Sequence, residues 1–272
     1  MKKNSVSPLL ALRTLPRHGD LLWELTKRDF LSRYKGSFLG LTWSLLQPLL
    51  MLAIYTFVFS VAFNARWGNG GDSKVDFAIV LFSGLIIHAL FAECLVRSPT
   101  LIACNQNYVK KVVFPLEILP LMSIGSALGQ FGLSLFVLLV FCAMASTPLH
   151  ATGLLLPILL LPMLLMVLGI SWFLASLGVY FRDLAHIIGM ITTVSLFLAP
   201  IFYPIDALPA NYQALLTLNP ITLPVNQLRS ALLWGEPLNW SAWSASLLAG
   251  LIVFYLGLTW FQKTRRGFAD VL

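Results

Sequence analysis

The most constraining feature of this sequence is an apolar stretch from Trp43 to Phe63, in which Tyr55 is the only ionisable side chain. A helix needs about twenty apolar residues to cross the hydrocarbon core of a bilayer, which is about 30 Å thick. Several similar stretches follow along the chain. We therefore expect a polytopic membrane protein, whose function lies in a pathway across the membrane.

The composition supports the same expectation. Hydrophobic residues make up 58% of the chain, charged residues 11%, and the mean hydropathy is +0.83. Soluble domains usually carry about 25% charged residues, so this chain cannot cover an ordinary soluble surface. The formal charge of +7 comes mainly from basic residues at the ends of the apolar stretches. This distribution indicates membrane topology, and we expect no nucleic-acid partner.

The apolar runs predict an all-α fold with six transmembrane helices, at about residues 38–63, 77–97, 115–145, 153–179, 186–203 and 242–262. Residues 1–37 would form a cytoplasmic N-terminal segment and residues 263–272 a cytoplasmic tail, so that 1–272 is a single membrane domain. The third stretch is long, and Pro115 and Pro120 near its start favour a tilted helix or a broken first turn.

The cationic residues are divided unequally between the two sides that six spans create. Fifteen of the eighteen Lys and Arg residues fall on the side of the termini, and the other side has only Arg66, Lys74 and Arg229. Because Lys and Arg concentrate in cytoplasmic loops, this imbalance predicts that both termini are cytoplasmic.

The outer segment of residues 204–241 contains five prolines but keeps many leucines. Prolines exclude one continuous helix, whereas short half-helices that dip into the outer interface would shield the leucines. We interpret the segment as a pair of re-entrant gate helices. A surface loop folded over the outer ends of the spans is the alternative.

No catalytic or metal-binding motif is present in the sequence. It lacks HExxH, GxSxG and GxxxxGK[ST], its four histidines are scattered, and its three cysteines form no CxxC pair. We therefore expect no catalytic residue, cofactor or metal in this chain, and no nucleotide hydrolysis by this chain itself.

Ionisable groups are energetically unfavourable inside apolar spans, so Glu93, Glu117 and Asp183 need an explanation. Glu93 and Arg97 are spaced i, i+4 and could pair on one helix face, and Glu117 could pair with Lys110 or Lys111. Structural ion pairs and proton coupling are the two interpretations, and structural pairing is favoured because a proton-driven carrier usually has more acidic groups near the midplane.

Aromatic residues suggest a conduit. Tyr55, Phe59 and Phe63 repeat every four residues on the first span, and a second wall could come from Phe197, Phe202 and Tyr203. Aromatic faces can stack on sugar rings without a charged group. Helix packing or an interfacial aromatic belt is the alternative.

A helix is predicted upstream of the first span, from Asp20 as N-cap to Lys35. Aromatic residues on one side and cations directed at headgroups would suit a helix in the membrane interface; these residues are Trp23, Phe30, Tyr34, Arg28, Arg33 and Lys35. An ordinary cytoplasmic helix is the alternative. Two GxxxG patterns, Gly36–Gly40 and Gly125–Gly129, could pack helices within one subunit or between two.

An ordered set of short motifs resembles the permease subunits of ABC transporters that export O-antigen, capsular and teichoic-acid polymers. The motifs cover nearly the whole chain: Lys27-Arg28-Asp29, Arg33-Tyr34-Lys35-Gly36-Ser37, Trp43-Ser44-Leu45-Leu46-Gln47-Pro48, Lys110-Lys111-Val112-Val113-Phe114-Pro115, Tyr180-Phe181-Arg182-Asp183-Leu184, Pro200-Ile201-Phe202-Tyr203-Pro204, Leu218-Asn219-Pro220 and Gly267-Phe268-Ala269-Asp270.

The resemblance implies a homodimeric permease in a bacterial inner membrane, with two separate ATPase subunits that bind ATP and Mg²⁺. It also implies that residues 100–115 form a coupling helix seated on the ATPase, and that a second contact follows the fourth span. The residues concerned are Asn107, Tyr108, Lys110, Lys111, Arg182 and Asp183. A local salt bridge is the alternative for Arg182 and Asp183.

The expected substrate is an undecaprenyl-linked glycan, whose lipid stays in the bilayer while the sugar passes through the conduit. The scarcity of basic residues inside the spans favours a neutral glycan. A small-molecule or drug ABC permease and a proton-coupled carrier are the alternatives. An apolar closed cavity would favour the drug permease, and independence from an ATPase would favour the carrier.

Overall fold

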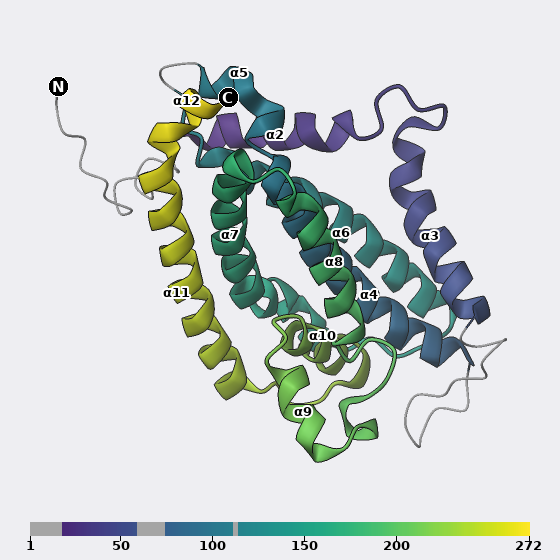
Figure 1. Cartoon of the computed structure of the whole chain (residues 1–272). Helices are drawn as coiled ribbons and strands as arrows, with labels where there is room; N and C mark the ends of the chain where they lie inside the picture. The colour runs from purple at the N-terminus through teal and green to yellow at the C-terminus, as the bar shows by residue number, and fades with distance from the viewer. Residues whose placement is uncertain (1–17, 59–73, 111–113) are drawn as a thin grey trace.

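The computed structural model describes residues 18–58, 74–110 and 114–272, which are helical throughout apart from short connections (Figure 1). Phe59, Phe63 and Lys111, three of the predicted site residues, lie outside the described residues. The α-helices are α2 (Gly19–Ser32), α3 (Trp43–Tyr55), α4 (Lys74–Arg97), α5 (Gln106–Val109), α6 (Ile118–Met144), α7 (Leu156–Tyr180), α8 (Leu184–Phe197), α9 (Ala210–Thr217), α10 (Thr222–Arg229), α11 (Trp240–Thr264) and α12 (Phe268–Val271).

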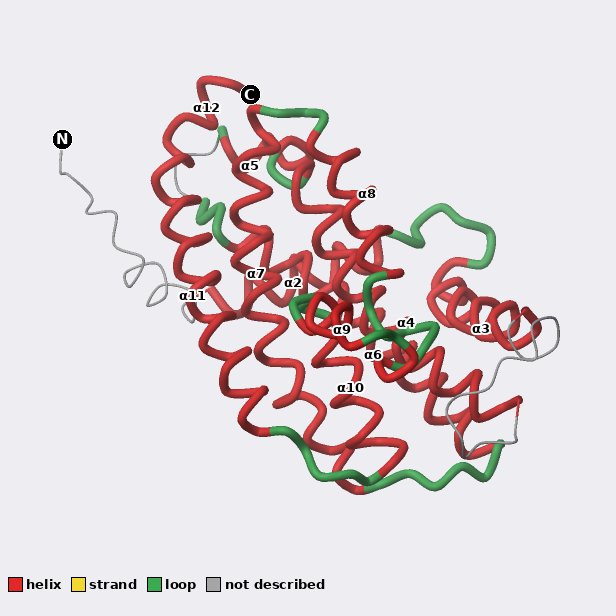
Figure 2. Tube along the Cα trace, turned by 60° about the horizontal axis from the view of Figure 1, so that its bottom comes forward, coloured by secondary structure: helices red, strands yellow, loops and turns green. Residues whose placement is uncertain are grey.

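The long helices run between two distinct ends of one bundle. Helices α2, α5 and α12 lie at one end, called here the α2 end, and α9 and α10 lie at the other, called the α10 end (Figure 1). When the α10 end is turned forward, α9 and α10 lie over the middle of the bundle, with α3 and α11 on opposite edges (Figure 2).

Within the described residues, five helical stretches are long and apolar enough to cross a membrane: Gly40–Val58, Val75–Thr100, Ile118–Met144, Ala151–Tyr180 and Trp240–Val271. The predicted span at 186–203 differs, because α8 has only 14 residues. At 1.5 Å per residue it is about 21 Å long, short of the roughly 30 Å that a perpendicular span needs. The apolar composition continues beyond Phe197, but Pro200 and Pro204 prevent the helix from doing so.

Glycines allow a close backbone contact between α7 and α11. A Cβ on Gly257 would overlap the carbonyl group of Gly169, and a Cβ on Gly169 would overlap the backbone of Val253. Small residues allow the two backbones to come this close. The resulting van der Waals packing stabilises the helix pair in lipid, where no hydrophobic driving force acts between helices.

The pattern Gly125–Gly129 packs α2 against α6 within one subunit. A Cβ on Gly125 would lie 2.8 Å from Cγ2 of Thr26, and one on Gly129 would lie 3.3 Å from the Phe30 ring. Of the two alternatives for this motif, contact within the subunit is the one observed. Gly36 and Gly40 have a different role, since their φ angles of +87° and +50° form the left-handed turns between α2 and α3.

Helix α2 begins at Gly19 with His18 as N-cap, so Asp20 lies in the first turn and is not the predicted cap. The aromatic residues also do not share one side. The Trp23 side chain is 66% exposed, whereas Phe30 packs on Gly129 and Leu25 is buried. Helix α2 is therefore seated on the bundle by one face and presents Trp23 on another.

The segment after α8 folds into the α10 end. Helix α10 packs against α4 and α7, and Ile221, Val225 and Leu228 are fully buried. This packing fits short re-entrant helices better than a surface loop, while the proposed gating role stays a prediction.

Arg229, which the sequence placed on the outer side, is completely buried. Its guanidinium donates to the carbonyl oxygens of Val80 at 2.9 Å and Pro200 at 2.6 Å, and to Oγ of Ser83 at 3.3 Å. It thus ties α10 to α4 and to the turn after α8. Gly84 provides the room, because a Cβ there would lie 2.8 Å from Nη2 of Arg229.

Replacing Gly125 by valine should weaken the docking of α2, because the added methyl groups would enter space that Thr26 occupies. Overpacking of this kind usually costs about 1–3 kcal/mol. The thermal midpoint of the detergent-purified protein should fall by several degrees. Gly132→Val on the same helix is the matched control, since a Cβ at Gly132 meets nothing within 4 Å. Equal midpoints for the two variants would contradict this packing role.

Candidate functional site

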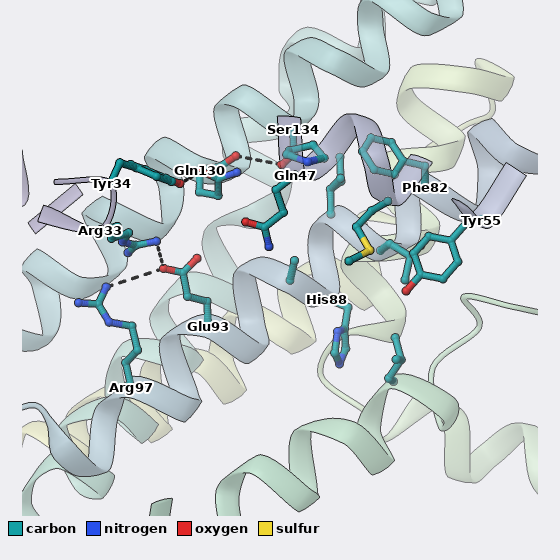
Figure 3. Close-up of a pocket in the computed structure, with 16 residues that line it drawn as sticks. Arg33, Tyr34, Gln47, Tyr55, Phe82, His88, Glu93, Arg97, Gln130 and Ser134 are labelled. Atoms are coloured by element: carbon teal, nitrogen blue, oxygen red, sulfur yellow. Dashed lines mark hydrogen bonds and ion pairs between the residues drawn. The ribbon is translucent and has the colours of Figure 1, made fainter. Parts of the chain in front are cut away.

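A central cavity of about 710 Å³ lies between α3, α4 and α6, with the end of α2 and Leu196 of α8 at its border (Figure 3). This volume is in the range of about 300–1,000 Å³ that is typical of small-molecule sites. Gln47 is exposed, so the cavity is open. Charged groups gather at one end of the cavity, and His88, Phe82 and Tyr55 lie toward the other (Figure 3).

Gln130 on α6 organises the polar wall of the cavity. Pro48 lies inside α3 and has no N–H, so the carbonyl of Ser44, four residues earlier, lacks its helical donor. Nε2 of Gln130 donates to that carbonyl oxygen at 2.9 Å. Oε1 of Gln130 accepts from the Tyr34 hydroxyl at 2.7 Å. One amide therefore satisfies a broken helix and holds the α2–α3 connection against α6.

His88 joins α4 to the short helix α8. Its Nε2 lies 3.0 Å from the carbonyl oxygen of Thr192, and Oγ of Ser195 is 3.5 Å away. Asn219 donates from Nδ2 to the Ser195 carbonyl at 3.1 Å, which links the same helix to the α10 end. The polar side chains beside the cavity thus hold α8 in place.

Four charged residues lie together at the α2 end of the cavity and are called here the ion-pair quartet: Asp29 of α2, Arg33 at the C-cap of α2, and Glu93 and Arg97 of α4. The Arg97 guanidinium donates to both carboxylate oxygens of Asp29, at 2.9 and 2.6 Å. Arg33 pairs with Glu93, and lies 3.6 Å from Asp29. The expected Glu93–Arg97 pair is present at 3.8 Å, but Asp29 is the closer partner of Arg97.

The pairing perturbs the groups of α2 and its connection to α3. Burial alone would raise the pKa of Asp29, but the hydrogen bonds from Arg97, with the charges of Arg97 and Arg33, outweigh it and hold this pKa below its ordinary value. Burial raises the pKa of the Tyr34 hydroxyl, so Tyr34 stays a hydrogen-bond donor to Gln130.

The predicted aromatic walls are only partly assembled at this cavity. Tyr55 lines it together with Phe82. Phe197 and Phe202 instead stack on each other, with ring centroids 5.6 Å apart, and the Tyr203 hydroxyl donates to the Phe197 carbonyl at 2.6 Å. These three residues form a separate cluster at the end of α8, where the proline-broken turn folds back on the helix, and only Leu196 of α8 reaches the cavity lining.

The predicted coupling residues lie in two connections at the α2 end. Asn107 and Lys110 are exposed on and just after α5, while Tyr108 stacks on Phe114 with centroids 4.3 Å apart. Arg182 and Asp183 are exposed between α7 and α8. Their arrangement leaves Asn107 and Lys110 available to a partner, and their coupling role stays a prediction.

The expected pairing of Glu117 with Lys110 needs correction, while Lys111 lies outside the described residues. Glu117 forms its ion pair with Arg265, which follows α11, because the start of α6 packs beside the end of that helix. Its backbone carbonyl accepts from Nε1 of Trp172 at 3.1 Å. Glu117 therefore joins α6, α7 and α11 at the α2 end.

A second cavity, of about 750 Å³ between α6 and α7, differs in chemistry. Its lining is leucine-rich, and His150 is its one titratable residue among those described. The central cavity instead offers amide, hydroxyl, imidazole and aromatic groups. These groups can bind a hydroxyl-rich ligand reversibly, which makes the central cavity the candidate transport site.

Sequence reasoning missed Asp29, Gln47, Gln130, His88 and Arg229 as parts of this arrangement. Gln47 stands next to a proline inside an apolar span, and Gln130 stands alone in another. A polar residue in an apolar span usually has a functional or packing role, so this signal was available. The partners of Asp29 and Arg229 come from distant segments and leave no local pattern.

The fold and the site define a multi-pass membrane protein, with a cavity of mixed polar and apolar lining among its spans. Residues 20–233 match the family model described as ABC-2 type transporter, and the chain belongs to this family. Members of the family are transport subunits that act with an ATPase.

The similar proteins carry one name. An O-antigen export system permease protein RfbA from Klebsiella pneumoniae is 28% identical over 254 residues, which cover 93% of this chain and 95% of that protein. A second protein of this name from the same species is 28% identical over 263 residues, with the same shares covered. A third, from Myxococcus xanthus, is 29% identical over 213 residues, covering 77% of this chain and 79% of its own length.

Proposed function

We propose that this chain is the permease subunit of an ABC exporter that moves a lipid-linked polysaccharide of the O-antigen type across the bacterial inner membrane. The observation that carries the proposal is the open cavity of about 710 Å³, with amide, hydroxyl and aromatic groups among an otherwise apolar lining, between the spans of an ABC-2 type chain. The names of relatives that match 93% of the chain support the substrate class.

The lining of the cavity suits a repeating polymer. Gln47, Ser134 and Tyr55 offer hydrogen bonds and one ring face, and each of these contacts is weak by itself. Conduction through a pore requires binding that is favourable enough for entry and weak enough for release. An undecaprenyl-type lipid would stay in the bilayer while the glycan passes by these groups.

A homodimer would complete the conduit. The face of α8 that carries Ile187, Met190, Val194 and Phe197 is exposed, with exposed fractions between 51% and 71%. Helix α8 is too short to span a bilayer alone. A second copy of the chain packed against this exposed face would cover the helix along its length. Helix α3 also carries exposed apolar residues, among them Met51 and Ile54, and Met51 lines the cavity.

Separate ATPase subunits would supply the energy and bind ATP and Mg²⁺, while this chain performs no hydrolysis. The excess of cations near both termini supports a cytoplasmic location of the α2 end. In that orientation α5 and the α7–α8 connection face the ATPase, and export runs from the α2 end to the α10 end.

Export of lipid-linked glycan to the cell surface tests the proposal. In a strain that lacks this gene, glycan should accumulate inside the cell. Restoring the gene together with an active candidate ATPase should return it to the surface, whereas the same gene with a hydrolysis-dead ATPase should not. Normal surface glycan without the gene would contradict the proposal and favour a small-molecule permease.

Reversing the charges at Lys110 and Lys111 should weaken the association with the ATPase. Lys110 is exposed beside α5, so glutamates should repel an acidic partner surface without disturbing the fold. We expect a reduction of about tenfold or more in substrate-stimulated ATP hydrolysis, measured in proteoliposomes, as two charge reversals at a contact cost several kcal/mol. Arg66→Glu with Lys74→Glu, predicted on the opposite side, is the matched control. Unchanged hydrolysis in the Lys110 and Lys111 variant would refute the coupling assignment.

A further inference from the structure

The charges around the central cavity cancel. Arg33, Glu93 and Arg97 are the formally charged residues among those that line it, which by themselves give a net charge of +1. Asp29 lies behind Arg97, in contact with both arginines, and brings the ion-pair quartet to zero. The remaining polar lining consists of uncharged amide, hydroxyl and imidazole groups.

The geometry of the quartet gives each guanidinium group a carboxylate partner, although Nε and Nη2 of Arg33 form no hydrogen bond and are buried. Helices α2 and α4 each contribute one carboxylate and one arginine at i, i+4 spacing, and each arginine contacts the carboxylates of both helices. The exposed fractions of the four side chains are between 13% and 31%, so solvent screens these charges only partly. A passing anionic sugar would have to displace a protein carboxylate to bind either arginine.

We infer that the quartet makes the cavity selective for an uncharged glycan over one that carries carboxylate or phosphate groups, with Glu93 as the specificity-determining residue. This inference depends on the proposed function and adds the charge of the sugar chain to it. An anionic glycan gains no free cation in the cavity and faces the Glu93 carboxylate at its border (Figure 3). The arrangement does not disfavour a neutral glycan, since sugar hydroxyl groups can form hydrogen bonds with the amides and hydroxyls of the cavity wall.

The selectivity follows from net charge, so it can be changed without changing the shape of the cavity. Glu93→Gln keeps the side-chain size and leaves one guanidinium charge in excess. The electrostatic attraction between an unpaired guanidinium and an anion a few ångströms away is strong in a partly desolvated site. The variant should therefore attract a uronate carboxylate. Adding Arg33→Gln to Glu93→Gln returns the site to zero through Asp29 and Arg97, so the double variant should regain the original preference.

The test uses the permease–ATPase complex in proteoliposomes and substrate-stimulated ATP hydrolysis as the readout. Two probes carry the same polyprenyl diphosphate, one with a neutral hexose oligosaccharide and one with the matched hexuronate oligosaccharide. The wild type should respond to the neutral probe at a concentration about tenfold lower. The ratio of the two concentrations that give half-maximal stimulation, hexuronate probe to neutral probe, should fall to about one in Glu93→Gln. The double variant should restore the wild-type ratio.

Asp20→Asn is the matched control, because it removes one carboxylate from an exposed position of the same helix α2 and should leave the ratio unchanged. If Glu93→Gln does not insert stably, Asp29→Asn adds the same net charge to the quartet and should narrow the ratio likewise. Equal responses of the wild type to both probes, an unaltered ratio in the charged variants, or no recovery in the double variant would overturn the inference. A wild type that responds to neither probe would instead overturn the proposed function.

Discussion

The cross-helix ion pairs between α2 and α4 are the interaction on which the rest of the arrangement depends. Without the bidentate contact of Arg97 with Asp29, helix α2 would be held to α4 by the Arg33–Glu93 pair alone among these ion pairs, beside its apolar packing on α6 and the hydrogen bond from Tyr34. Arg97 would also lose its closer carboxylate partner at the cavity border, and uncompensated charges in partly buried sites are strongly destabilising. The same four groups therefore hold the α2 end together and neutralise the mouth of the candidate conduit.

The requirement to satisfy backbone polar groups away from water explains the other polar contacts. Gln130 supplies the donor that Pro48 removes from α3, and Arg229 supplies donors to Pro200 and Val80 at the α10 end. In lipid, each unsatisfied backbone group costs several kcal/mol, so an interrupted helix needs such a partner. The interruptions at Pro48 and Pro200 border the cavity and the turn after α8, which makes these side chains part of the transport architecture.

The sequence predicted the features that depend on local composition. The lengths of the apolar stretches predicted the spans, because the thickness of the bilayer fixes how long a spanning helix must be. The span predicted at 242–262 agrees closely with α11, Trp240–Thr264. The i, i+4 spacing of Glu93 and Arg97 also indicated a pair that the structure contains. The prediction for 186–203 was wrong in length, because hydrophobicity continues through Pro200 where the backbone cannot.

Contacts between distant segments could not be predicted in this way. Asp29 and Arg97 are 68 residues apart, Tyr34 and Gln130 are 96 apart, and Glu117 and Arg265 are 148 apart. No periodicity relates such positions, and Glu117 had nearer lysines as apparent partners. The family motifs predicted the general architecture, but the central cavity required the positions of α3, α4 and α6 in space.

Site-specific photocrosslinking tests most directly whether the central cavity carries the glycan. A photoreactive benzoylphenylalanine at position Gln47, in the cavity wall, would be illuminated during transport of a radiolabelled lipid-linked glycan. The same substitution at Leu251, which is 44% exposed on α11 far from the cavity, is the reference. The account predicts a glycan adduct at position 47 and none at position 251. Continued export with no adduct at position 47, or with equal adducts at both positions, would contradict it.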